Sequence, residues 1–332
     1  MKRMIVTITI LMFAIIIIPS LLVIPNAWKQ TEAQKSEPKV HVEVVASPID
    51  VPVYRSEKEQ VEKIPLEEYV AGVLSSEMPA EFELEALKAQ ALAARTYIVK
   101  QLLEPSEISL PEGAAVTDTT LHQVYNSREE LMDQWGNDFD WKYAKIVKAV
   151  EETRGRILTF DGQTITAAFF STSNGYTENA EDYWQNESPY LKSVSSPWDK
   201  ASPKFTDSQE IPVSVIEETL GVTLPSDGSV GEILERTESN RVSLVEIGGK
   251  RFSGRDIRER LDLNSSDFSW ERKGDVVVFH TKGFGHGVGM SQYGANGMAM
   301  EGKDAEEIVR YYYQGIDISN VSPFVAKLTA KQ

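Results

Sequence analysis

The sequence contains no cysteine, only four histidines, and fewer basic than acidic residues. Without cysteine the chain has no disulfide, no thiol nucleophile and no zinc site with cysteine ligands. The histidines are His41, His122, His280 and His286, and only the last two lie near each other in the sequence. Because a structural zinc site normally takes four close ligands, we expect no metal and no cofactor.

The charge balance argues against a nucleic-acid-binding protein. Lysine and arginine total 34 against 50 aspartates and glutamates, a formal net charge of −16. Binding to nucleic acid depends on neutralising phosphates, and no basic stripe offsets the acidic total. We therefore expect no nucleic-acid partner. With 332 residues, 41% hydrophobic and 25% charged, the composition is that of a globular protein with one large domain or two modest ones.

One segment lacks charge altogether. Residues 4–25, MIVTITILMFAIIIIPSLLVIP, would span about 33 Å as a helix, which is close to the hydrocarbon thickness of a bilayer. Lys2 and Arg3 precede it, which favours a cytosolic N-terminus at residues 1–3 and an exported remainder. A cleaved signal peptide is the alternative, but the segment is longer than a usual signal core and no small-x-small site follows it. We predict an uncleaved, single-pass anchor in the cell membrane.

The remainder is predicted to be an α+β protein. Residues 26–50 read as a polar tether followed by a first strand, KVHVEVV at 39–45, in which polar and apolar residues alternate. Residues 51–326 are expected to form one body of mixed helices and β-hairpins, with residues 206–272 as a candidate inserted subdomain. No internal repeat is present.

Turn and capping residues predict several elements of this body. Pro65 opens a helical pattern at its first position, and Pro79 ends it, because the residue before a proline avoids the α region. The next helix is marked by four residues at helical spacing: Leu84, Leu87, Ala91 and Ile98. Residues 104–140 are rich in loop formers and acidic side chains and carry no assignable pattern.

Further along the chain, β-hairpins are predicted at two tight turns, Asp161-Gly162 and Gly248-Gly249. A helix around residues 146–153 should end at Gly155, and DVVVFH at 275–280 reads as an apolar strand. Two more helices are predicted from capping pairs, Ser253 with Asp256 and Asp304 with Glu307.

The stretch VLSSEMPAEF places Glu77 at the break between the first two predicted helices. Carbonyl dipoles at a helix C-terminus disfavour an anion, and the Ala- and Leu-rich helix that follows would add desolvation. The pKa of Glu77 is therefore expected above its usual value of about 4.3. A carboxylic acid kept protonated near neutral pH can protonate the leaving oxygen of a glycosidic bond. The alternative is a solvated surface glutamate, the common fate of this residue type.

Lys88 and Arg95 are seven residues apart, so they lie on one face of the following helix. Together they would make an edge that recognises anions, because arginine offers a planar fork for a carboxylate and lysine a point charge. A solvated polar face is the alternative for the pair.

Three long segments of the chain resemble the signature blocks of the stage II sporulation protein D family, which also contains amidase enhancers. They are IPLEEYVAGVLSSEMPAEFELEALKAQALAARTY, FFSTSNGYTENAEDYWQNESPYLKSVSSPWD and GFGHGVGMSQYGANGMAMEGKDAEEIVRYYYQGI. They occur in the family's order, and the resemblance as a whole extends over nearly all of the predicted exported part.

The resemblance implies a lytic transglycosylase that cleaves peptidoglycan between N-acetylmuramic acid and N-acetylglucosamine, on glycan strands already stripped of stem peptides. It implies action on the septal wall during engulfment in sporulation, from the mother-cell membrane. The partners that it implies are an amidase/endopeptidase, stage II sporulation protein P, and a membrane scaffold, stage II sporulation protein M. A non-catalytic module that binds glycan and enhances a partner amidase is the alternative function.

In the family the catalytic acid is the Glu of the SEMP segment, here Glu77, and Lys88 and Arg95 match residues implicated in activity. The implied reaction is intramolecular: a C6 hydroxyl of the same sugar ring attacks C1, so one carboxylate suffices where ordinary glycosidases use two. Lys88 and Arg95 would suit the free lactyl carboxylates of denuded strands. Glu178, Asp182 and Asp199 are candidates for a second, charge-stabilising carboxylate, although loop or capping roles explain each of them better.

The two later blocks supply candidate sugar-binding residues. Ser171 and Ser173 follow an apolar strand and precede a turn, where hydroxyls suit sugar recognition, with plain turn chemistry as the alternative. Some family members carry zinc ligands in this region, including cysteines, but this chain lacks them and we predict no metal there. Four glycines alternate from Gly283 to Gly289 without matching a dinucleotide or phosphate-binding loop.

Glycines on one face of an extended strand would admit a ligand or another strand. The residues expected to line a glycan groove beside them are His286, Ser291, Gln292 and Tyr293, the tyrosine stacking on sugar faces. A buried structural histidine is the alternative for His286, and His280 is expected to be structural.

Overall fold

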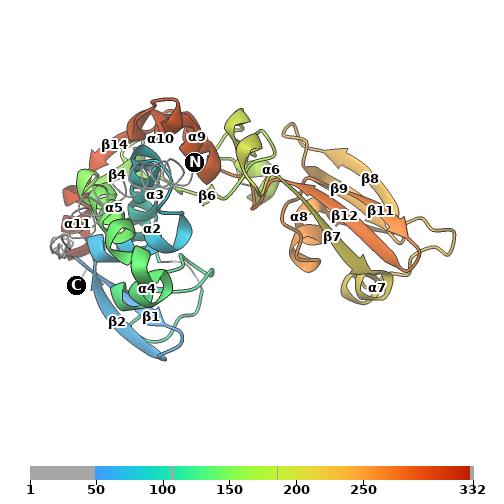
Figure 1. Ribbon diagram of the computed structural model, residues 1–332, viewed down its shortest axis with the longest axis horizontal. Coiled ribbons are helices and arrows are strands. Elements are labelled where there is room, and N and C mark those ends of the chain that lie inside the picture. The colour runs from blue at the N-terminus through green and yellow to red at the C-terminus, as the bar shows by residue number, and fades with distance from the viewer. Residues whose placement is uncertain (1–48, 106–107, 185, 330–332) are drawn as a thin grey trace, which may run out of the picture. The chain divides into compact units, whose positions relative to one another are not determined.

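The computed structural model describes residues 49–105, 108–184 and 186–329 (Figure 1). The chain divides into two compact units, Met1–Val42 and Glu43–Gln332, and the described residues belong to the second. The predicted anchor at 4–25 and strand at 39–45 lie outside the described residues. Within the described ranges, no helix is both long enough and apolar enough to cross a membrane.

The described chain mixes helices and strands, as the predicted α+β class requires (Figure 1). The helices are α2 Leu66–Glu77, α3 Leu84–Leu103, α4 Arg128–Trp135, α5 Phe139–Glu152, α6 Ala180–Trp184, α7 Val213–Leu220, α8 Gly254–Arg260, α9 Gln292–Met300, α10 Ala305–Tyr312 and α11 Ser322–Thr329. Two 3-10 turns, η1 Gly136–Asp138 and η2 Pro197–Ala201, complete them.

The strands form small sheets. They are β1 Asp50–Arg55, β2 Gln60–Pro65, β3 Val116–Thr117, β4 Arg156–Phe160, β5 Gln163–Thr164, β6 Phe169–Phe170, β7 Thr206–Pro212, β8 Gly231–Arg236, β9 Val242–Ile247, β10 Lys250–Ser253, β11 Phe268–Lys273, β12 Val276–Lys282, β13 Met290–Ser291 and β14 Asp317–Asn320. The sheet orders are β2-β1-β3, β14-β4-β5, β13-β6, β10-β9-β8 and β11-β12-β7.

Among the described residues, the larger of two hydrophobic cores surrounds α3, which contacts α2, α5, α9 and α10. This helix is buried along most of its length, and many of its buried residues are alanines, which let the neighbouring helices approach closely. The pairing of β6 with β13 is parallel, with Met290 beside Phe169 and Ser291 beside Phe170. That pairing joins the second and third motif blocks of the sequence side by side.

The smaller core contains apolar residues between Ile211 and Phe279. It overlaps the candidate inserted subdomain at 206–272 but continues past residue 272, because β12 pairs with β7 in register from Val276 with Pro212 to Lys282 with Thr206. The division of the chain into an inserted and a surrounding part stays a prediction.

The two predicted hairpins and the two predicted capping pairs are confirmed, whereas the helix expected to end at Gly155 ends at Glu152. Positive φ angles of 48° and 71° at Asp161 and Gly162 close the hairpin of β4 and β5, and Gly248-Gly249 joins β9 to β10. Full capping boxes start α8 at Ser253 and α10 at Asp304. Pro65 is the residue before α2 rather than its first helical residue.

The glycine-rich loop differs from the expectation of an extended strand. The φ angles of its four alternating glycines, 84°, 116°, 87° and 81°, are all left-handed. A Cβ on Gly287 would meet the Arg241 guanidinium at 2.6 Å, and one on Gly289 would meet the Ala168 carbonyl oxygen at 2.1 Å. The alternation therefore serves close approach by other parts of this chain rather than an open face for a ligand.

Gly289→Ala is expected to destabilise the fold more than Gly302→Ala. Both glycines have left-handed φ, 81° and 88°, which costs an alanine about 1–2 kcal/mol. Nothing lies within 4 Å of a Cβ on Gly302, whereas one on Gly289 would displace the Ala168 carbonyl, which accepts hydrogen bonds from Met290 and Tyr313. Overpacking of this kind adds about 1–3 kcal/mol. Urea unfolding of the two variants measures the difference, and equal losses would show that Ala168 yields freely.

Candidate functional site

Glu77 is the last residue of α2, and its side chain is partly buried. The backbone N–H of Val124 donates to Glu77 Oε1 at 3.1 Å, and within the described chain no group donates to Oε2. The side-chain amide of Gln292 donates to the backbone oxygen of Glu77 at 2.9 Å. One carboxyl oxygen thus has a fixed protein partner, and the other has no hydrogen-bond donor within the described chain.

Burial raises the pKa of Glu77, and the hydrogen bond from Val124 partly opposes that rise. The direction agrees with the sequence-based expectation, and desolvation is its main cause. The nearby Tyr69 is almost fully buried and its pKa lies well above the usual value, so its hydroxyl is uncharged at physiological pH. The site thus favours a neutral carboxylic acid.

The start of α9 supports the turn that follows Glu77. The Tyr293 ring meets the Phe82 ring edge-on with centroids 4.9 Å apart, and Asn296 Oδ1 accepts from the Glu83 backbone N–H at 2.8 Å. Gln292 is buried and its amide is committed to Glu77, so it acts on the acid's position. Tyr293 remains partly exposed beside this turn. Of these two predicted residues, Gln292 contacts Glu77 and Tyr293 packs on the turn that follows it.

Lys88 is already paired. Its Nζ lies 2.8 Å from Glu85 Oε1 and 3.1 Å from Glu152 Oε2. Burial alone would lower the pKa of Lys88, but its hydrogen bonds to these two carboxylates raise it. A substrate carboxylate would share this ammonium group with Glu85 and Glu152.

Arg95 does not form the anion-binding edge that its spacing from Lys88 suggested. Its side chain is 0% exposed, and its Nη2 lies 2.6 Å from Glu67 Oε2. Further hydrogen bonds reach the backbone oxygens of Val150 and Arg156. Residues seven apart lie on one face of a helix, but the larger hydrophobic core covers this face of α3 at Arg95. Arg95 therefore joins α2, α3 and the end of α5 and does not contact solvent.

Ser173 and Ser291 are also structural rather than exposed to a sugar. Both are 0% exposed, and both hydroxyls donate to Asp199, at 2.8 and 2.5 Å. Ser196 donates to the same carboxylate, and burial raises the pKa of Asp199 while these hydrogen bonds oppose the rise. The three motif-block serines thus hold β6, η2 and the start of α9 together. Ser171 keeps partial exposure, and its backbone oxygen accepts from the Tyr293 N–H.

His286 fits its alternative interpretation as a structural histidine. Its ring lies 5.5–5.8 Å from the rings of Phe170, Tyr183 and Trp184, and its Nδ1 accepts from the Val288 N–H at 3.0 Å. Burial, reinforced by Arg258 and Arg241, lowers the pKa of His286 to about 3, so it is neutral at physiological pH. No part of this environment requires a ligand.

The candidates for a second carboxylate have partners of their own. Glu178 is buried and accepts from the hydroxyls of Thr237 and Ser239, each at 2.8 Å. Asp182 accepts from the Asn179 side chain, and Asp199 accepts from the serines. Among the described residues, no three His, Asp or Glu side chains gather into a group that could hold a metal ion.

Sequence reasoning missed Val124, the donor to Glu77, because a backbone N–H leaves no mark in a sequence. It also missed Glu67, the partner of Arg95, and the carboxylates around Arg55 described below. A capping pair, Ser127 with Glu130, was a readable signal in the unassigned segment, where it starts α4 with a full capping box.

The fold and site thus define an α+β protein in which the third sequence block contacts the partly buried Glu77 of the first block and pairs with the second block through β13 and β6. The profile of the family described as "Stage II sporulation protein" matches residues 54–160. The chain is 50% identical over 343 residues to "Stage II sporulation protein D" of Bacillus subtilis (strain 168) and 48% identical over 344 residues to that of Bacillus amyloliquefaciens, with 100% of each chain covered. The chain therefore belongs to the stage II sporulation protein D family and is a sporulation protein.

A more distant similarity is to "Amidase enhancer" of Bacillus subtilis (strain 168). It is 29% identical over 306 residues, which is 75% of this chain and 40% of that protein. The sequence-based recognition of the family is confirmed.

Proposed function

We propose that this protein is a lytic transglycosylase that cleaves denuded glycan strands of peptidoglycan between N-acetylmuramic acid and N-acetylglucosamine. The observation that carries the proposal is the carboxyl group of Glu77. It is partly buried and its pKa is raised, Val124 fixes one of its oxygens, and within the described chain no group donates to the other. A general acid needs this combination, because it must hold a proton near neutral pH and present it in a fixed direction.

In the proposed reaction Glu77 donates its proton to the glycosidic oxygen as the bond to C1 breaks. The C6 hydroxyl of the same muramic acid attacks C1, and its proton passes to the Glu77 carboxylate, which restores the acid. The products are a 1,6-anhydromuramic end and a free hydroxyl on the departing sugar, and no water is consumed. An attacking group on the same ring has a high effective concentration, which removes the need for a second carboxylate to activate water.

The cellular setting is part of the proposal. The charge-free segment at 4–25 supports a single-pass anchor with the catalytic body outside the cytoplasm, in the mother-cell membrane facing the septal wall. The partners proposed from the family resemblance are stage II sporulation proteins P and M. The proposed sugar contacts are Tyr293, at the start of α9, and Ser171, whose backbone oxygen accepts from the Tyr293 N–H; both side chains are partly exposed.

The alternative function is a glycan-binding activator of a partner amidase, which the name of the more distant relative supports. This alternative needs a groove but no acid. The two functions therefore differ in whether the chain alone produces new glycan ends.

Incubation of the purified full-length chain with denuded glycan strands tests the proposal. We expect anhydromuramyl ends detected by mass spectrometry, and a rate that falls as the pH rises through the raised pKa of Glu77, because the acid must be protonated to act. Intact strands at every pH, together with stimulation of an added amidase, would support the alternative instead.

A further inference from the structure

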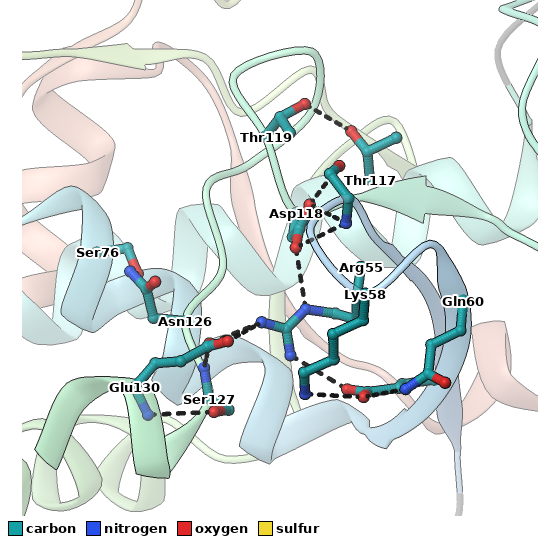
Figure 2. A network of polar contacts seen from close by, with 12 residues as sticks. Arg55, Lys58, Gln60, Ser76, Thr117, Asp118, Thr119, Asn126, Ser127 and Glu130 are labelled. Carbon is teal, nitrogen blue, oxygen red and sulfur yellow. Dashed lines mark hydrogen bonds and ion pairs between the residues drawn. The ribbon is translucent and has the colours of Figure 1, made fainter. Parts of the chain in front are cut away.

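A cluster of charged side chains surrounds Arg55 at the end of β1. Arg55 is 3% exposed and reaches three carboxylates: Glu62 at 3.1 Å, Asp118 at 3.0 Å and Glu130 through both oxygens at 2.6 and 2.8 Å. Figure 2 shows Arg55 at the centre of these contacts. Its partners come from β2, from the loop after β3 and from α4. One guanidinium thus fixes both ends of the segment between Asp118 and Glu130.

The middle of that segment lies against α2. The Arg55 guanidinium lies 4.9 Å from the centroid of the Tyr125 ring, and this ring stacks on Tyr69 at 5.6 Å. A Cβ on Gly72 would come within 2.3 Å of the Tyr125 ring, so only glycine admits the ring at this point of α2. Tyr125 is therefore held between Arg55 and the helix that carries Glu77.

The residues on either side of Tyr125 contact the end of α2. The Val124 N–H donates to Glu77 Oε1, and the Asn126 side chain donates to Ser76 Oγ at 2.8 Å. Both contacts depend on where Tyr125 sits, because adjacent residues cannot move independently. The path from Arg55 to the acid is continuous through Tyr125 and Val124.

We propose that Arg55 is a positioning residue for Glu77, which holds the 118–130 segment against α2 so that the Val124 N–H fixes one carboxyl oxygen and aims the other. The role of Glu77 as the acid rests on the proposed function, whereas the contact itself does not. Arg55 touches neither substrate nor the acid directly.

The charges of the cluster persist over the working pH range. Burial would raise the pKa of Asp118 and of Glu130, but their hydrogen bonds, including those from Arg55, lower both values. Burial would lower the pKa of Arg55, but Asp118 and Glu130 raise it overall. His122, in the same segment, has a pKa lowered by burial, and buried Tyr69 and Tyr125 have raised values, so these three stay neutral near pH 7. Burial raises the pKa of Glu77 and also that of Glu68, which faces Tyr125 from α2.

Loss of the clamp has a specific electrostatic result. The Val124 hydrogen bond favours the charged carboxylate and lowers the pKa of Glu77, so its loss should raise that pKa further. The basic limb of the pH–rate profile then moves to higher pH, while misalignment of the acid lowers kcat by about 10- to 100-fold with little change in KM. A purely structural role for Arg55 would not move this pKa.

The experiment compares Arg55→Met and Gly72→Ala with the wild-type full-length chain. Gly72→Ala displaces Tyr125 without changing any charge, so it tests the same path if Arg55→Met fails to fold. Arg251→Met is the matched control. The Arg251 side chain is 69% exposed, and its ion pair with Glu246 is a long one, with 3.8 Å between Nε and Oε2. The readouts are the pKa of the Glu77 carboxyl by NMR, assigned with Glu77→Gln, and the pH profile of glycan cleavage.

We expect both test variants to raise the pKa of Glu77 and to lower kcat, and the control to change neither. An unchanged pKa of Glu77 in the folded test variants overturns the proposal. If the wild-type chain does not cleave glycan, the proposed function fails, yet the NMR result still decides whether Arg55 positions Glu77.

Discussion

Replacing Glu77 with glutamine is expected to slow glycan cleavage by about 10²- to 10⁴-fold, the usual contribution of a general acid. Glutamine keeps the shape and can still accept the hydrogen bond from Val124, but it has no acidic proton to give. The fold should be unaffected, because Glu77 makes no ion pair within the described residues. Initial rates of anhydromuramyl product, measured by mass spectrometry beside the thermal unfolding curve, check both parts.

Glu77→Asp is the matched variant for that result. It keeps an acid but withdraws it by one methylene, so its rate should lie between those of the wild type and Glu77→Gln. Full activity in folded Glu77→Gln would remove this residue from the chemistry and would leave α2 as a merely structural helix.

Replacing Arg95 with alanine is expected to have the largest effect on stability, about 3–5 kcal/mol, because removing one member of a buried ion pair leaves its partner charge uncompensated. The stranded group is Glu67, whose side chain is 3% exposed. Loss of the bonds to Val150 and Arg156 adds to the effect. Denaturant unfolding of the purified chain measures the change in the free energy of unfolding.

Lys88→Ala is the control, because Lys88 lies on the same helix, α3, as Arg95. The Lys88 partners are 31% and 41% exposed, and ion pairs at such positions contribute about 0–1 kcal/mol. The double change Arg95→Met with Glu67→Leu should recover much of the stability, since a buried pair is often replaceable by apolar side chains. If Arg95→Ala unfolds like the wild type but binds glycan poorly, Arg95 contacts substrate after all and its burial is not maintained in solution.

Sequence reasoning succeeded where the physical cause is local. The hairpin at Asp161-Gly162 depends on backbone angles that these two residues favour, and the capping pair at Ser253 and Asp256 needs only its own first turn. The raised pKa of Glu77 was also predictable, because the helix break and the apolar helix after it are both visible in the sequence.

Sequence reasoning failed where a residue's role depends on what packs against it. Arg95 and Lys88 lie on the same helix, but burial next to Glu67 decides the role of one and nearby Glu85 and Glu152 decide that of the other. The serines of two motif blocks meet at Asp199 only because β6 pairs with β13. Spacing along a chain does not reveal such partners.

The unassigned segment at 104–140 is a second case in which contacts with distant residues decide the structure. It carried no assignable pattern because it is rich in loop formers and acidic side chains, yet it supplies Val124 and Tyr125 to α2 and carboxylates to Arg55. Its order comes from contacts with distant parts of the chain, which a periodic pattern does not report.

The central claim is that Glu77 drives an intramolecular cleavage without water. The most direct test is the mass of the glycan ends released by the full-length chain in water enriched in heavy oxygen. The account predicts anhydromuramyl ends that carry no heavy oxygen. Reducing ends that carry heavy oxygen would show hydrolysis and would contradict the account.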